Sequence, residues 1–201
     1  MRHIIWLFFI LGFNTAALAQ NLPDAFFVTG VAADDVLIIR AEPSARSAIV
    51  GQLGPQAINV EVIALSDNGK WGKVSTGEGN GWVAMRFLER SNHTPAGEVP
   101  RPMACFGTEP FWALGMYPRG DEYELAGDGR RDLIPLKEIT AFQGYAVVFE
   151  EGPGLTRTLM IERGACDDGM SDRDYGWRAM LLNETPQGDS LQYGCCTLDL
   201  R

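Results

Sequence analysis

Short apolar runs, broken by turn residues, recur along most of the chain. Residues 60–65 alternate between apolar and polar side chains over most of their length, as in a strand with one buried face. Asp67-Asn68-Gly69 is typical of a tight hairpin turn. Turns at intervals of about 8–12 residues predict an all-β protein. The strands expected in the first half are 26–31, 36–39, 49–53, 60–65, 71–74 and 82–84.

The second half of the chain shows the same pattern with longer apolar runs, and helix signals are nearly absent. Gly, Pro, Asp and Asn punctuate every gap between the runs. About seven antiparallel strands in sequence order predict a meander that closes into a barrel. These strands are expected at 111–117, 122–125, 133–142, 145–150, 155–162, 175–182 and 190–197.

Residues 91–104 interrupt this pattern. They contain Pro95, Pro100 and Pro102 and have no apolar periodicity, which favours an extended, semi-rigid spacer. We therefore expect two domains, 20–90 and 105–201, joined by a Pro-rich linker at 91–104. We also expect the two domains to fold separately.

The first nineteen residues have the pattern of a secretory signal peptide. Met1-Arg2-His3 is followed by an apolar run at 4–13 and by Ala17-Leu18-Ala19, a small-residue cleavage site. The run is about half the roughly 20 residues that a membrane-spanning helix needs. Residues 1–19 are therefore expected to be removed on export, leaving a chain that does not span a membrane.

Charge and histidine content exclude several functions. The formal net charge is −9, whereas nucleic-acid binding needs clustered Lys and Arg. Removal of residues 1–19 leaves His93 as the one histidine, and it lies in the linker. A catalytic centre of the Ser–His–Asp or Cys–His kind is therefore not expected.

The four cysteines, Cys105, Cys166, Cys195 and Cys196, predict two disulfides in an exported protein. Neighbouring side chains on a strand point to opposite faces, so Cys195 and Cys196 should take different partners. Cys105 then pairs with one of them and Cys166 with the other, and the sequence leaves open which. The spacing contains no C-x2-C pair, so zinc is not expected.

The segments VTGV, VLIIRAEPS, IVGQL, VEVIAL, NGKWGKV, GWV and RFL, within residues 26–90, resemble a bacterial SH3-type domain (SH3b). Ile38 and Glu42 depart from the family pattern, beside or in one loop. The resemblance implies a small barrel that binds a cell-wall component or an envelope protein, without catalysis. It also implies that Arg40, Trp71 and Trp82 line a ligand groove.

The residues themselves favour another role for the two tryptophans. A domain of this size needs large apolar side chains in its core, so Trp71 and Trp82 are expected to be core residues. Recognition of Pro-rich peptides needs a groove lined by aromatic residues. The loop at 32–35 contains no Tyr, so this type of ligand is not expected.

Three motifs mark the second domain: GTEPFW at 107–112, CDDGMSDRDY at 166–175 and GCC at 194–196. Together they resemble an uncharacterised family of exported proteobacterial proteins and lipoproteins. The resemblance covers residues 104–197 and implies no established activity. With the SH3-type segments it indicates a periplasmic protein of the cell envelope.

The acidic loop at 167–174 is open to two interpretations. Its four carboxylates provide the hard oxygen ligands that Ca²⁺ prefers, but their spacing fits no EF-hand loop. Asp and Ser in such a run more often cap turns, and we expect no metal or cofactor. If Cys105 and Cys166 both reach the adjacent cysteines, the nearby motifs converge. The sequence then predicts one structural or binding cluster of Glu109, Asp168, Asp172 and Arg173.

The sequence as a whole predicts an all-β, non-enzymatic cell-envelope binding protein. It would consist of an N-terminal SH3-like small barrel and a C-terminal antiparallel barrel-like domain with two disulfides. Two alternatives stay open. One is a wall-acting hydrolase that uses carboxylates of the second domain, such as Glu109 and Asp172. The other is an inhibitor of lytic enzymes, in which an acidic domain faces a basic enzyme.

We predict cleavage after Ala19 during export, because a charged start, a short apolar run and a small-residue site occur in that order. Mass spectrometry of the native protein should find a chain that begins at Gln20. Recovery of the full-length chain from the membrane fraction would contradict this prediction.

Overall fold

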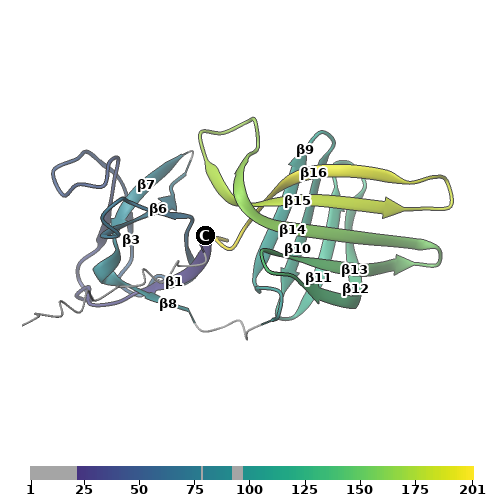
Figure 1. Ribbon diagram of the computed structural model, residues 1–201, viewed down its shortest axis with the longest axis horizontal. Helices are drawn as coiled ribbons and strands as arrows, with labels where there is room; N and C mark the ends of the chain where they lie inside the picture. Colours follow the sequence, from purple (N-terminus) through teal and green to yellow (C-terminus); the bar gives the residue numbers. More distant parts are fainter. Residues whose placement is uncertain (1–21, 78, 92–96) are drawn as a thin grey trace, which may run out of the picture.

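The computed structural model describes residues 22–77, 79–91 and 97–201. The predicted signal peptide, His93 and part of the predicted linker lie outside these residues. Strands dominate both halves of the chain, as Figure 1 shows, which confirms the all-β prediction. No helix within the described ranges is long and apolar enough to cross a membrane.

The N-terminal domain packs two antiparallel sheets around one apolar core. The first sheet has the order β4–β1–β8 and the second the order β3–β2–β7–β6–β5. The strands are β1 (Asp24–Val28), β2 (Leu37–Arg40), β3 (Ile49–Leu53), β4 (Val60–Val62), β5 (Ala64–Leu65), β6 (Trp71–Ser75), β7 (Asn80–Ala84) and β8 (Leu88–Arg90), with a 3-10 turn, η1, at Met85–Phe87. The core residues are Phe26, Val28, Leu37, Ile39, Leu53, Val60, Val62, Val74, Val83 and Leu88.

The strand predicted at 60–65 is two strands, because the chain changes sheets at Ile63. Val62 of β4 lies opposite Asp24 in the first sheet, whereas Ala64 of β5 lies opposite Lys73 in the second. One segment therefore forms the corner between both sheets, as in small packed β domains.

The C-terminal domain is a closed barrel of eight antiparallel strands, in the order β10–β11–β12–β13–β14–β15–β16–β9. Its strands are β9 (Met103–Thr108), β10 (Phe111–Tyr117), β11 (Gly120–Leu125), β12 (Gly129–Thr140), β13 (Gly144–Gly152), β14 (Leu155–Asp167), β15 (Asp174–Glu184) and β16 (Ser190–Thr197). Seven of these strands match the sequence prediction in place and order. The eighth, β9, pairs with both β10 and β16 and so closes the barrel.

Both disulfides form, and the structure decides their pairing. Cys105 of β9 is bonded to Cys196 of β16, and Cys166 at the end of β14 is bonded to Cys195. The first bond is fully buried in the barrel core, whereas Cys166 is only half-buried. Each bond closes a loop of tens of residues, 91 and 29 apart in sequence. Loops of that length make each bond worth about 3–5 kcal/mol of stability.

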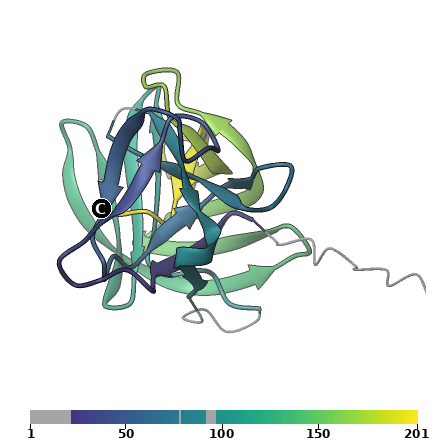
Figure 2. The same cartoon turned by 90° about the vertical axis from the view of Figure 1, so that its left-hand side faces the viewer.

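The N-terminal domain lies at one end of the barrel, with the C-terminus between the two (Figures 1 and 2). Ala25 of β1 packs against the barrel core, and Val99, within the predicted linker, belongs to that core. β9 likewise begins at Met103, two residues before the predicted domain boundary. The described end of the linker is therefore anchored to the barrel.

A buried carboxylate joins the domains. Glu61 of β4 points away from the N-terminal core and is 3% exposed. Nε1 of Trp177 donates to one of its oxygens at 3.0 Å, and Oγ1 of Thr197 donates to the other at 2.6 Å. Around this pair, Ser75 Oγ donates to Asp199 at 2.6 Å, and Lys73 pairs with Asp174. The domains are thus held by hydrogen bonds as well as by apolar contact.

Burial raises the pKa of Glu61 to about 7, against the lowering effect of hydrogen bonds from Thr197, the backbone of Leu198 and Trp177. An undocked Glu61 would return to the ordinary value of 4.5. The docked protein therefore holds the proton more tightly. The contribution of Glu61 to docking is therefore fully present below pH 4.5 and is lost as the pH rises through 7.

We predict that the contribution of Glu61 falls by about 3 kcal/mol between pH 4.5 and 7 and then levels off. Melting temperatures at several pH values should show this loss in the wild type. Glu61→Gln cannot titrate, so its pH dependence should be shallower, whatever its absolute stability. Exposed Glu89→Gln is the control and should retain the wild-type slope. Equal slopes for wild type and Glu61→Gln would contradict the prediction.

Candidate functional site

A groove of about 420 Å³ lies on the N-terminal domain, between the loop that follows β1 and the turn η1. Its aromatic residues are Trp71 and Phe87, and its charged residues are Arg40, Arg86 and Asp35. The remaining lining residues are small or aliphatic: Gly30, Val31, Ala32, Val36, Leu37, Ile38, Ala45 and Ala84. The volume is within the range of about 300–1,000 Å³ that is usual for ligand sites.

The two arginines of the groove are both positioned by contacts of their own. Nη1 of Arg40 donates to the carbonyl oxygen of Ser47 at 2.9 Å. The guanidinium carbon of Arg86 lies 4.5 Å from the centre of the Phe87 ring. Two arginines against the single acid Asp35 make the groove positive, although the whole chain carries −9. The groove therefore attracts anions that the rest of the surface repels.

The prediction that both tryptophans are core residues is wrong. In the sheet register, Arg40 and Lys73 each lie opposite Trp82, and Trp71 lies opposite Ala84. Directly opposed residues share a face, so Arg40, Trp71 and Trp82 all lie on the face that points away from the core. The structure places Arg40 and Trp71 in the groove and Trp82 beside it, outside the lining residues.

The tryptophans lie on the outer face because the inner face of β6 and β7 has room only for small side chains. Gly72, Val74, Gly81 and Val83 face inward, where a Cβ on Gly72 would lie 2.6 Å from the sulfur of Met85. A tryptophan could not be accommodated there. The alternation of small and large residues was visible in the sequence, but it does not reveal which face has room.

The acidic loop of the barrel is organised around Asp168. Its carboxylate accepts hydrogen bonds from the backbone N–H groups of Met170 and Ser171, both at 2.9 Å, and from the hydroxyl of Tyr175 at 3.1 Å. Burial opposes ionisation of Asp168, but these hydrogen bonds outweigh it and lower its pKa. The loop therefore has the turn structure expected of Asp and Ser. Among the described residues, no three His, Cys, Asp or Glu side chains are placed to hold a metal ion.

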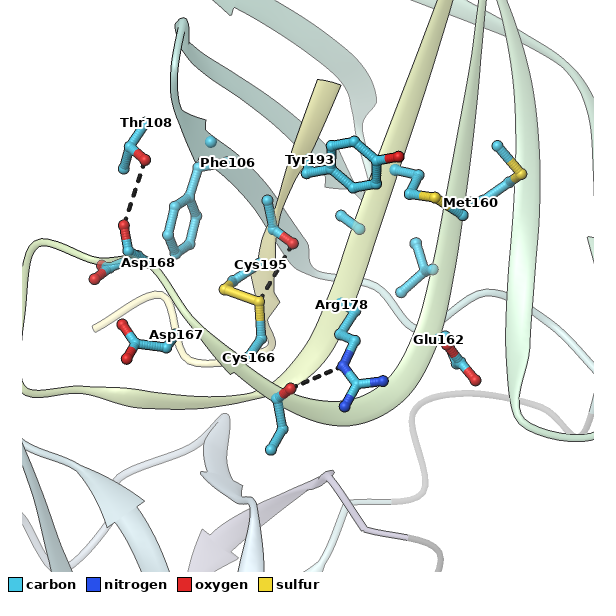
Figure 3. Close-up of a pocket in the computed structure, with 16 residues that line it drawn as sticks. Phe106, Thr108, Met160, Glu162, Cys166, Asp167, Asp168, Arg178, Tyr193 and Cys195 are labelled. Carbon is cyan, nitrogen blue, oxygen red and sulfur yellow. Dashed lines mark hydrogen bonds between the residues drawn. A yellow bond between two sulfur atoms is a disulfide. The ribbon is translucent and has the colours of Figure 1, made fainter. Parts of the chain in front are cut away.

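The predicted cluster is brought together only in part. Oγ1 of Thr108 donates to the backbone oxygen of Asp168 at 3.3 Å, so the GTEPFW and CDDGMSDRDY segments do meet (Figure 3). Glu109 and Asp172, however, are both exposed. Arg173 lies 5.1 Å from the ring of Tyr175, and no ion pair within the described ranges joins it to an acid of the cluster. The segments therefore meet through Thr108 and the backbone rather than through Glu109 and Arg173.

Phe87, Arg86 and Asp35 line the groove although the sequence pattern did not single them out. The RFL segment that contains Arg86 and Phe87 was part of the SH3-type pattern, so the resemblance held the missing signal. What it could not show is that η1 turns both side chains toward β2.

Comparison with known proteins supports the nature of the first domain. Residues 35–89 match the family model of the bacterial SH3 domain. No curated protein and no solved structure matches the chain. The matched range contains Arg40, Trp71, Arg86 and Phe87, so most of the groove belongs to the matched domain. The resemblance of residues 104–197 to an exported protein family stays a prediction.

Asp168→Ala should loosen the loop at 167–174, because it removes the shared acceptor of several hydrogen bonds. A loss of about 1 kcal/mol of stability is expected, with faster hydrogen exchange at Met170 and Ser171. Asp167→Ala is the matched control, since Asp167 accepts only from Gly169 N in this loop. Similar exchange rates in both variants would show that Asp168 does not organise the loop.

Proposed function

We propose that the protein is a non-enzymatic binding protein of the bacterial cell envelope. Its bacterial SH3-like domain would hold a wall component or envelope protein in the groove of Arg40 and Trp71. The observation that carries the proposal is the positive, aromatic groove on a strongly acidic chain. The match of residues 35–89 to a bacterial SH3 domain supports binding in the envelope in general terms.

The chemistry of the groove favours a ligand with a carboxylate next to an apolar or sugar surface. Arginine forms short, charge-assisted hydrogen bonds with carboxylates, often two at once. Trp71 and Phe87 offer flat apolar faces against which an alkyl chain or a sugar ring can pack. The peptide stems of the cell wall combine acidic groups with small apolar side chains, so they are the ligand we propose.

The proposal contains no catalytic step. Hydrolysis by two carboxylates needs two acids about 5–10 Å apart across the scissile bond. The groove contains the single acid Asp35, and Glu109 and Asp172 of the second domain are exposed. Binding, rather than cleavage, is what the charges of the groove support.

We further propose a periplasmic location. Two disulfides in a chain of this size are typical of an oxidising compartment, and the bacterial SH3-like domain is consistent with the envelope.

The mature protein should co-sediment with purified peptidoglycan. Arg40→Ala should raise the apparent Kd about tenfold, since it removes a charge-assisted contact, and Trp71→Ala should weaken binding to a similar degree. The matched controls are Arg46→Ala, an exposed arginine outside the groove, and Trp82→Ala, on the same sheet face but outside the lining. Each variant is first compared with the wild type by thermal melting.

The same incubation tests for catalysis if soluble wall fragments are measured in the supernatant. Fragment release that Glu109→Gln abolishes would replace the binding proposal by the hydrolase. Unchanged binding in Arg40→Ala and Trp71→Ala would remove the groove as the ligand site.

A further inference from the structure

A second cavity, of about 530 Å³, lies on the outer surface of the barrel beside the Cys166–Cys195 disulfide (Figure 3). Its floor crosses the neighbouring strands β14, β15, β16 and β9. In the sheet register, Met160 lies opposite Met180, and Met180 lies opposite Tyr193. These three side chains therefore form one row across three strands, with Phe106 of β9 nearby among the lining residues.

Large apolar side chains of this row are open to solvent. Met180 of β15 is 38% exposed and Tyr193 of β16 is 64% exposed, because both side chains lie on the outer face of the barrel. Flexible thioethers beside aromatic rings are typical of surfaces that adapt to a partner side chain. Contiguous apolar side chains on a solvent-exposed face often mark a site where another molecule binds.

Contacts within the protein fix the wall of the cavity near Ala165 and Cys166. The pairing of β14 with β15 is irregular between Arg163 and Cys166, which lifts Ala165 out of the ladder. Nε of Arg178 donates to the backbone oxygen of Ala165 at 2.9 Å, and the disulfide ties the next residue to β16. These contacts within the protein fix this wall of the cavity, so binding does not have to order it.

The charge around the cavity is negative. Glu162, Asp167 and Asp168 line it, against the single base Arg178. Glu162 and Asp167 are exposed and have no ion pair within the described part of the chain. The one positive charge of Arg178 offsets only one of these three acids. An occupant with positive charge next to an apolar group would complement this cavity.

The dimensions favour a short peptide. Four adjacent strands at about 4.8 Å spacing give a floor of about 14 Å, the length of about four extended residues. We propose that this cavity binds a basic, apolar segment of a partner protein. An apolar side chain of the segment packs between Tyr193 and Met180, and a basic side chain pairs with Glu162. The cavity lies in a different domain from the groove of Arg40 and has the opposite charge, so this inference does not depend on the proposed function.

The test uses the full mature chain and a fluorescein-labelled pentapeptide, Lys-Phe-Lys-Leu-Lys, followed by fluorescence anisotropy at about 0.15 M salt. Binding is expected below about 1 mM. Two peptides, Glu-Phe-Glu-Leu-Glu and Lys-Ser-Lys-Ser-Lys, should each bind at least tenfold more weakly, because one reverses the charge and the other removes the apolar anchors. The methyl NMR signals of Met160 and Met180 should shift with the first peptide.

Matched variants locate the site. Met180→Ser and, independently, Tyr193→Ser should raise the Kd at least fivefold, and Glu162→Gln about threefold. Ile134→Ser, an exposed apolar residue of β12, and Glu124→Gln, an exposed acid of β11, are the controls and should leave the Kd unchanged.

Three results would overturn the proposal. They are no binding of Lys-Phe-Lys-Leu-Lys up to about 1 mM, equal binding of the acidic peptide, and equal Kd values in the cavity variants and the controls. Sedimentation of the protein alone tests a further occupant. A dimer that Met180→Ser dissociates would assign the cavity to a second copy of this chain instead.

Discussion

A carboxylate that is buried away from water needs hydrogen-bond donors, and those of Glu61 belong to the C-terminal barrel. Trp177 belongs to the core of the barrel, and Thr197 directly follows the buried Cys196. The donors are therefore as rigid as the barrel itself, and Glu61 fixes the small domain against them. A buried, partly satisfied acid stabilises little in itself, but it permits few orientations. Together with the Ser75–Asp199 and Lys73–Asp174 contacts around it, this contact sets the relative placement of the two cavities.

The two cavities divide the charge of the protein between them. The groove of Arg40 and Arg86 is positive and aromatic, whereas the cavity beside Cys166–Cys195 is negative and lined by methionine and tyrosine. Both are supported by contacts within the protein: Ser47 holds Arg40, and the disulfide holds the wall near Ala165. If both proposals hold, one molecule would bind an acidic partner in the groove and a basic partner in the cavity.

Alternation of apolar and polar residues along the chain was enough to predict most of the strands. It failed where the environment of a residue is set by a distant part of the chain or by the space between the sheets. Met103, Cys105 and Gly107 alternate as buried positions of β9, but the prolines before them placed Met103 in the predicted linker, and no strand was predicted at 103–108. Glu61 alternates outward from the small core, on the face that a strand with one buried face leaves to solvent, and only the barrel covers it. Trp71 and Trp82 were assigned to the core because they are large, although the glycines beside them left no space there. Alternation along a strand shows which residues share a face, but not which face is buried or what lies against it.

The distance along the chain between Glu61 and its donors sets an order of events during synthesis. Thr197 lies 136 residues after Glu61, and Asp199 lies 124 residues after Ser75. The small domain therefore leaves the ribosome long before the last barrel strand exists. In that interval no barrel covers Glu61, and a charge on an uncovered sheet face opposes association with other chains. The same position is thus suited to water before the barrel exists and to donors of the barrel afterwards.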